Sequence, residues 1–459
     1  MIKLKEFGAY KKLNSINSNE FRAYLNQCWK KRYFLYDDSD IYNNEEGDKE
    51  QKFLTFDGDY IKARNYVGFI NFNGESVTVY PKIFTNEIKE EDVDKFLITN
   101  LMYWLRGSSR IKFPIIDIDL EFNKEESFLE ILIYIFSKIT LDAVYSSPYF
   151  SYEEVEEELS YLKGRINIKE YFKNNISTGR WNSFNVVHEP FIYNNKVNKI
   201  IKFVARKLYS VSKNKKSIIN LEKILFILED IDDIIFGESA CNNININRFN
   251  KEYENVISLC ELFLKNSSIT LGKNNDKLNF CFLLPMELIF EDFIYNFIKE
   301  NYNCNFKEII RQKSNLYLAD LYLNENHSGK LFNLKMDIYL KDNCSNEYIL
   351  DTKYKVINSN KLEHYGISQS DMYQMCSYAL RGGCNKLALI YPKTFELEEE
   401  IKLVINNKLN FTDIEIDILN FNFLLDFSDY IKGENIKNLY LKNDKLLRLD
   451  IEKYFSLTI

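Results

Sequence analysis

Apolar and polar residues alternate with a period of two in two neighbouring segments, residues 334–341 and 348–353. Such alternation is typical of β-strands that pack one face on a core. Residues 342–346, between the two segments, are Asp, Asn, Cys, Ser and Asn, which is the chemistry of a turn. The pattern predicts a β-hairpin whose loop would place Asp337 opposite Asp351.

The predicted hairpin gathers charged side chains on one face. Asp337 and Asp351 would face each other, and like charges across a strand pair are destabilising. Lys353, two residues beyond Asp351, shares its face. A divalent cation would compensate the charges, because carboxylate oxygens are the ligands that Mg²⁺ prefers.

These residue types suit a metal-dependent nuclease. A bound metal lowers the pKa of a water molecule and stabilises charge on the scissile phosphate. The lysine can neutralise the transition state. Asp337 and Asp351 are therefore candidate metal ligands and Lys353 a candidate catalytic residue. The alternative is a surface hairpin with scattered charges.

The segments around the hairpin predict further regular elements. Residues 368–383 have the pattern of a helix with Ser370 as a candidate N-cap and two glycines at its end. Gln374 and Tyr378 are four residues apart, so they project from one helix face. Residues 386–392 predict a buried strand.

A second helix is predicted upstream, over residues 285–298, with proline at its first position. Glu287 and Glu291 share one face of this helix. A solvated helix face explains both glutamates equally well. An ordinary polar helix edge is likewise the alternative for Gln374 and Tyr378.

These motifs together resemble the PD-(D/E)xK nucleases, with Asp337 as the first carboxylate and Asp351-Thr-Lys353 as the second half. Met336 stands where the nominal proline would be. The Gln374 and Tyr378 pair is similar to the Q-x-x-x-Y helix of the RecB-like branch. The resemblance implies that a glutamate on the preceding helix completes the metal site, and Glu291 matches that position better than Glu287.

The resemblance narrows to the McrC family, the nuclease subunits of modification-dependent McrBC restriction systems, over roughly residues 65–395. It rests on four C-terminal segments and four earlier ones: residues 285–294, 350–355, 370–378, 389–392, 67–70, 79–83, 162–168 and 195–202.

Membership of this family would imply an Mg²⁺- or Mn²⁺-dependent endonuclease that cuts duplex DNA carrying modified bases. The partner would be a McrB-like AAA+ GTPase, a hexameric motor. A non-cleaving scaffold that binds DNA and the motor is the alternative. The intact Asp337, Asp351 and Lys353 set argues against that alternative.

The coarse pattern predicts an α+β or α/β multidomain chain. Residues 1–120 form a mixed, β-containing region with a hairpin turn at Asn73-Gly74, and by resemblance this region engages the motor. Residues 121–270 are mainly helical and basic. Residues 271–459 hold the nuclease domain, a restriction-endonuclease-like fold.

Charge is distributed unevenly along the chain, whose formal net charge is −7. Residues 159–216 contain thirteen Lys and Arg against Glu170 and Glu189, a local charge of +11 that leaves −18 for the rest. Such a block suits phosphate contact. The DNA-binding candidates are Lys163, Arg165, Lys199, Lys202 and Arg206. A solvated basic face, or docking on an acidic partner, is the alternative.

Composition excludes several other classes. The 8 cysteines contain no CxxC pair and the chain has 3 histidines, so zinc fingers and disulfide scaffolds are poor interpretations. No GxxxxGK[ST] motif occurs, so we do not expect this chain to hydrolyse nucleotides itself. We also expect no secretory signal and no membrane span, hence a cytoplasmic protein.

Overall fold

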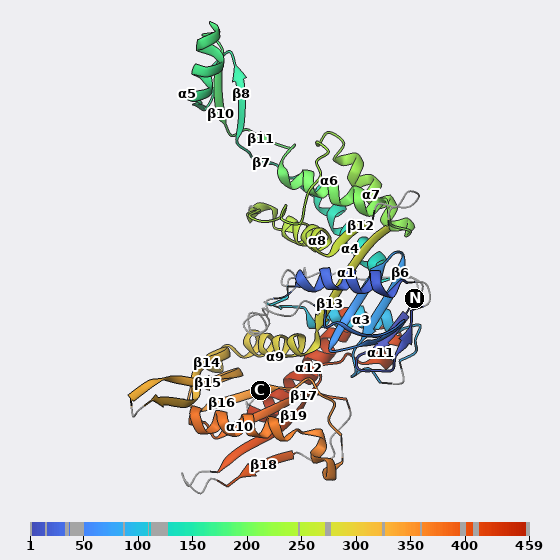
Figure 1. The fold of residues 1–459 in the computed structure, drawn as a ribbon, viewed down its shortest axis with the longest axis vertical. Coiled ribbons are helices and arrows are strands. Elements are labelled where there is room, and N and C mark those ends of the chain that lie inside the picture. The colour runs from blue at the N-terminus through green and yellow to red at the C-terminus, as the bar shows by residue number, and fades with distance from the viewer. Residues whose placement is uncertain are drawn as a thin grey trace. The chain divides into compact units, whose positions relative to one another are not determined.

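The structure is a computed structural model that describes residues 2–13, 16–32, 36, 50–85, 88–108, 110–111, 127–246, 248–270, 277–323, 326–358, 360–394, 401–406 and 413–455. The chain divides into two compact units (Figure 1). Unit 1 comprises Met1–Phe128 and Asn279–Ile459, and unit 2 is Leu129–Leu278, inserted between them. The predicted middle region corresponds to unit 2. The predicted first and third regions, in contrast, share a single unit.

The N-terminal part of unit 1 is built on a sheet in the order β1-β6-β5-β13 (Ile2–Lys5, Glu75–Tyr80, Tyr66–Phe72 and Lys277–Pro285). Strands β5 and β6 form a hairpin in which Phe72 pairs with Glu75. Asn73 and Gly74 both have positive φ, 51° and 83°, as the two-residue turn predicted from the Asn-Gly pair requires.

A second, small sheet runs in the order β2-β4-β3 (Lys11–Lys12, Tyr60–Ala63 and Leu54–Asp57). Helix α1 (Ser18–Lys30) begins at the side-chain cap of Asn17. The helix buries Phe21 and Trp29. The Trp29 ring packs edge-on against Phe53 with a centroid distance of 5.0 Å.

Helix α3 (Val93–Trp104) connects the N-terminal part of unit 1 to its C-terminal part. Its last residue, Trp104, stacks on Phe423 at 4.4 Å between ring centroids. The indole of Trp104 also donates a 2.7 Å hydrogen bond to the carbonyl of Phe423. Contacts of this kind explain why segments distant in sequence form one unit.

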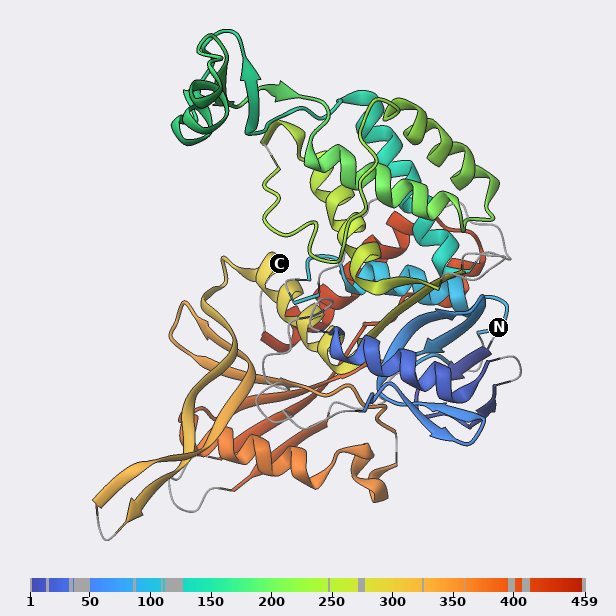
Figure 2. The ribbon, with the colours of Figure 1, turned by 45° about the horizontal axis from the view of Figure 1, so that its top comes forward.

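The C-terminal part of unit 1 is a six-stranded sheet in the order β14-β15-β16-β17-β19-β18 (Phe306–Leu323, Asn326–Asp342, Glu347–Thr352, Lys386–Pro392, Ile414–Phe421 and Ile401–Ile405). Strands β16, β17 and β19 are parallel. The hairpin of β14 and β15 runs out beyond the other strands (Figure 2).

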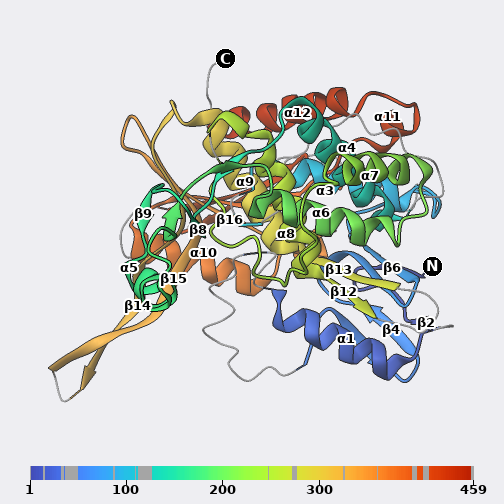
Figure 3. The same ribbon diagram turned by 90° about the horizontal axis from the view of Figure 1, so that it is seen from above.

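Helices cover both sides of this sheet. Helix α10 (Gln369–Gly382) and helix α12 (Ile436–Phe455) lie on opposite sides (Figure 3). On the α10 side, Met375, Tyr378 and Ala379 of the helix are buried in one cluster with strand residues such as Ile349 and Leu389. Helix α9 (Met286–Tyr302) follows β13 directly, and α11 (Phe427–Ile431) precedes α12.

Unit 2 is mainly helical, with α4, α6, α7 and α8 (Phe128–Ser146, Lys196–Tyr209, Lys215–Ile227 and Glu252–Asn266). It also contains a module of short strands and turns over residues 151–192. The module comprises β7, β8, β9, α5, β10 and β11 (Ser151–Tyr152, Val155–Leu159, Arg165–Ile166, Ile168–Glu170, Phe184–His188 and Phe191–Ile192).

The predicted fold class, an α+β multidomain chain, is confirmed. The hairpin, the strand over residues 386–392 and the helices on either side of them are all present. Among the residues that the structure describes, no helix is both long enough and apolar enough to cross a membrane.

Gly68 in β5 supports a prediction about stability. Its φ is +134°, and a Cβ built there would lie 2.1 Å from the backbone oxygen of Phe282 in β13. We expect Gly68→Ala to lower the free energy of unfolding by well over ~1 kcal/mol, because the backbone conformation is strained and the strands must also separate.

The matched control is Gly58→Ala. Gly58 also has positive φ, +57°, but no atom lies within 4 Å of the added Cβ. Urea denaturation of both variants separates the steric clash from the backbone strain. Equal destabilisation by the two substitutions would contradict this account of Gly68.

Candidate active site

Strands β15 and β16 bring the two predicted aspartates together. Ile338 pairs with Leu350, so Asp337 comes next to Asp351 across the strand pair, as the alternation predicted. Asp337 Oδ2 accepts two 2.8 Å hydrogen bonds, one from the backbone N–H of Thr352 and one from its hydroxyl. The first aspartate is thereby fixed to the residue that separates Asp351 from Lys353.

Asp351 is fully buried, on the face of β16 that also packs Ile349 against helix α10. The Lys353 ammonium lies 2.6 Å from Asp351 Oδ2. Within the described part of the chain, Oδ1 of this carboxylate accepts no hydrogen bond. A buried carboxylate oxygen without a donor is costly.

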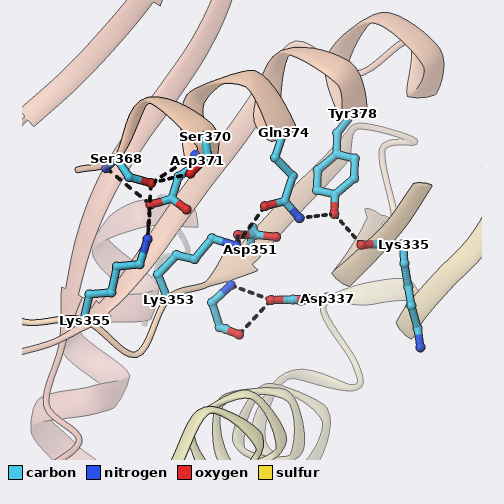
Figure 4. Close-up of polar contacts among 11 residues, drawn as sticks. Lys335, Asp337, Asp351, Lys353, Lys355, Ser368, Ser370, Asp371, Gln374 and Tyr378 are labelled. Atoms are coloured by element: carbon cyan, nitrogen blue, oxygen red, sulfur yellow. Dashed lines mark hydrogen bonds and ion pairs between the residues drawn. The ribbon is translucent and has the colours of Figure 1, made fainter. Parts of the chain in front are cut away.

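A chain of hydrogen bonds orients Lys353 (Figure 4). Its ammonium donates to Gln374 Oε1 at 2.9 Å. The Gln374 amide N–H donates to the Tyr378 hydroxyl at 2.6 Å, and that hydroxyl donates to the carbonyl of Lys335 on β15. Tyr378 thereby fixes which end of the Gln374 amide faces Lys353. The predicted pair of Gln374 and Tyr378 on α10 lies in the site and positions the lysine ammonium.

Helix α10 begins two residues earlier than the sequence predicted. Ser368, rather than Ser370, is the N-cap, and it forms a capping box with Asp371. Asp371 Oδ2 also accepts a 2.7 Å hydrogen bond from the ammonium of Lys355. Although burial opposes the charge, the hydrogen bonds from Lys355 and Ser368 hold the pKa of Asp371 below its usual range.

Helix α9 contributes Glu291 and not Glu287. Glu287 is exposed. Oε1 of Glu291 accepts a 2.9 Å hydrogen bond from Gln312 on β14 and lies 3.3 Å from the guanidinium of Arg110. Of the two candidate glutamates, the one favoured by the family resemblance is therefore held among charged and polar groups.

The carboxylates affect one another electrostatically. Burial, and then the charge of Asp337, raises the pKa of Asp351 to about 8 and that of Glu291 to about 7. Burial also raises the pKa of Asp337. Burial opposes the charge of Lys353, but Asp351 and Asp337 outweigh it and raise the lysine's pKa. The three acids and the lysine form one interacting group, which is typical of a functional site.

The donor set suits a hard divalent cation. Asp337 and Asp351 offer carboxylate oxygens, one of them without a hydrogen-bond donor. Among the described residues, no three His, Cys, Asp or Glu side chains form an arrangement that could hold a metal ion. Mg²⁺ is commonly bound by one or two carboxylates, several waters and substrate phosphate, so the two aspartates fit it.

The basic residues of α6 that the sequence predicted to contact DNA are paired with aspartates in the structure. Lys202 is buried, and its ammonium donates to the carbonyls of Glu229 and Ile231 and lies 3.3 Å from Asp233. Lys199 and Arg206 pair with Asp232 and Asp233 at 3.2 and 2.9 Å. Lys163 and Arg165, in contrast, are exposed in the module over residues 151–192.

Several site residues gave no signal in the sequence. Arg110 lies far from the nuclease motifs in sequence. Gln312 lies in β14 just before the register shift between Lys313 and Leu316 and has a φ of 49°. Thr352 could have been suspected, because it stands between Asp351 and Lys353 and its backbone N–H faces Asp337.

Comparisons with known proteins show the family and the fold of the chain. A model of the family described as McrBC 5-methylcytosine restriction system component matches residues 61–392. The chain belongs to this family. The match covers almost the same residues as the resemblance found in the sequence, which is confirmed. The search of curated proteins finds no match.

Two solved structures are similar to the chain. One is a "refined half-complex from tetradecameric assembly of Thermococcus gammatolerans McrB AAA+ hexamers with bound McrC", at 18% identity and a TM-score of 0.67, covering 97% of this chain and 99% of that chain. The other is the cryo-EM structure of the Thermococcus gammatolerans McrBC complex, at 20% identity and a TM-score of 0.48, covering 65% of this chain and 87% of that one. At this identity the first likeness shows a common fold.

The buried carboxylate predicts how stability depends on pH. In the folded protein the pKa of Asp351 is raised to about 8, whereas in the unfolded chain its pKa is about 3.9. Between these values the folded state binds more protons, so the free energy of unfolding should fall as pH rises, by at most ~1.4 kcal/mol per pH unit for this group.

Asp351→Asn removes this titration, so we expect a shallower pH dependence and, above pH 8, a more stable protein than the wild type. Urea denaturation from pH 5 to 9 in the presence of EDTA measures both, with the exposed variant Asp59→Asn as the control. The same slope in wild type and Asp351→Asn would contradict the account given for this carboxylate.

Proposed function

We propose that this protein is the Mg²⁺-dependent endonuclease subunit of a McrBC-like restriction complex. The observation that carries the proposal is the grouping of Asp337, Asp351 and Lys353, in which a buried carboxylate oxygen lacks a donor. A structural ion pair would satisfy its oxygens. A carboxylate that pairs with the lysine through one oxygen and leaves the other without a donor is suited to a cation and a phosphate instead.

Asp337 and Asp351 would hold Mg²⁺ or Mn²⁺, and Glu291 is the candidate for a third contact, direct or through water. When bound, the cation supplies Lewis-acid stabilisation of negative charge at the scissile phosphate. Thr352 holds Asp337 in place through two hydrogen bonds. The first ligand therefore needs little reorganisation before the cation binds.

Lys353 has the main role among the other residues. Its ammonium, now 2.6 Å from Asp351, would neutralise charge on the phosphate and orient the attacking water. Gln374 holds the ammonium from the side of α10, and Tyr378 fixes the amide of Gln374. Gln374 and Tyr378 thus position the lysine and take no part in bond breaking.

For the partner, we propose a hexameric AAA+ GTPase of the McrB type. The described structure suggests a contact surface different from the N-terminal region that the family resemblance implied. Residues 1–128 share a compact unit with the nuclease part. The module over residues 151–192 in unit 2 instead exposes large apolar side chains: Tyr152, Tyr161, Leu162, Ile168, Phe172, Trp181 and Phe191.

Exposed aromatic residues gathered in one small module are typical of protein interaction sites. We therefore place the motor contact on this module. Lys163 and Arg165, exposed in the same module, remain candidates for contact with the phosphates of duplex DNA, modified or not. Lys199, Lys202 and Arg206 are better explained by their pairing with Asp232 and Asp233.

Substitution of the cleavage residues tests the nuclease proposal. Asp337→Asn, Asp351→Asn and Lys353→Ala should each reduce DNA cleavage by at least ~100-fold, since a lost electrostatic contact in a transition state costs ~3–4 kcal/mol. The assay contains Mg²⁺, the cognate AAA+ protein and GTP. The matched controls are Asp342→Asn and Lys341→Ala on the same strand, and both should cleave normally. Undiminished cleavage by the three site variants would refute the nuclease assignment.

Separate measurement of GTP hydrolysis tests the partner proposal. Alone, the chain should cut DNA poorly, and the cognate motor should switch cleavage on while its own GTP hydrolysis rises. Phe172→Ala and Trp181→Ala should reduce this stimulation, whereas Asp351→Asn should keep it although it cannot cut. Normal stimulation by the two aromatic variants would place the motor contact elsewhere.

A further inference from the structure

Residues 107, 108 and 110, which follow α3, contact helix α9 beside the proposed cleavage site. The loop turns at Gly107, whose φ is +75° and where an added Cβ would lie 2.6 Å from the Glu300 carboxylate. The hydroxyl of Ser108 donates to Asp292, the neighbour of Glu291, and accepts a 3.0 Å hydrogen bond from the N–H of Ile111. These contacts fix the loop on both sides of Arg110.

Arg110 reaches Glu291 from this loop. Its side chain is 6% exposed, and NH1 lies 3.3 Å from Glu291 Oε1. Gln312 Nε2 donates to the same oxygen at 2.9 Å. Within the described residues, no hydrogen bond or ion pair involves the other carboxylate oxygen. One oxygen is therefore anchored from two sides, and the second is available for a ligand.

The charge of Arg110 acts on more than Glu291. It also opposes the effect of burial on Asp337. Arg311 also acts on Glu291 electrostatically, but Arg110 is the cation that lies within 4 Å of its carboxylate. Loss of Arg110 would leave Gln312, a neutral amide, as the remaining hydrogen-bond donor to Glu291.

We propose that Arg110, supplied by the N-terminal part of the chain, is a positioning residue of the cleavage site and acts by holding Glu291 ready for the divalent cation, with Gln312 as its second support. The inference rests on the proposed function and adds to it. The nuclease centre is then completed by residues outside the C-terminal nuclease region, and the isolated region would lack one of its supports.

Binding of Mg²⁺ to the full chain, measured by calorimetry and by the rise in melting temperature, tests this inference without a cleavage assay. Arg110→Gln should weaken Mg²⁺ binding ~10-fold or more, because residues that support a metal ligand typically contribute 10- to 100-fold. Arg106→Gln is the matched control: Arg106 lies in the same loop but pairs with Asp444 at 2.8 Å, so it should bind Mg²⁺ normally.

A second variant guards against failure of Arg110→Gln to fold. Gln312→Asn shortens the amide so that it no longer reaches Glu291, and asparagine tolerates the positive φ of this position. It should also weaken Mg²⁺ binding. In a Glu291→Gln background Gln312→Asn should have no further effect, and Arg110→Gln a clearly smaller one than in the wild type, because Glu291 carries most of the effect of Arg110.

Unchanged or tighter Mg²⁺ binding in folded Arg110→Gln would overturn the inference, since the arginine would then merely compete with the cation. An equal loss in the Glu291→Gln background would also overturn it. Failure of the proposed function is a different result: Mg²⁺ binding would then be absent, or would be insensitive to Asp337→Asn.

Discussion

The burial of the Asp351 carboxylate is the constraint on which the site depends. The Asp351 side chain is 0% exposed, on the face of β16 that also packs Ile349 against helix α10. A carboxylate in that position carries a large desolvation cost, which an ion pair offsets only when its geometry is good. Lys353 meets one oxygen, and the other has no hydrogen bond within the described residues. The arrangement is explained if a cation completes it.

The rest of unit 1 holds that group in place. Hydrogen bonds from Lys353 to Gln374, from Gln374 to Tyr378 and from Tyr378 to the carbonyl of Lys335 connect the end of β16 through α10 to β15. The capping box at Ser368 fixes where α10 begins. The loop with Arg110 approaches from α3. Residues 1–128 and 279–459 form one compact unit, and the Arg110–Glu291 pair is one of the contacts between these two parts of the chain.

Local patterns in the sequence predicted the parts of the site that depend on local structure. Period-two alternation gave the register of Asp337 and Asp351, and four-residue spacing gave the face shared by Gln374 and Tyr378. Arg110 and Lys202 could not be predicted in this way. Arg110 contacts a residue 181 positions away in sequence. Lys202 can be buried because the carbonyls of Glu229 and Ile231 accept hydrogen bonds from its ammonium. Neither contact produces a periodic pattern of residue types in the sequence.

Unit 2 offers less unpaired positive charge than its sequence indicates. Three basic residues of its helix α6, Lys199, Lys202 and Arg206, pair with Asp232 and Asp233, so the positive charge of residues 159–216 overstates what the surface offers to DNA. The chain leaves unit 2 through β13, which pairs with β5 from Phe280 to Pro285 and leads directly into α9. Glu291 lies early in that helix. The chain therefore leads from unit 2 to Glu291, which Arg110 and Gln312 hold. A firmly fixed Glu291 would keep the proposed cleavage site intact while unit 2 engages a partner.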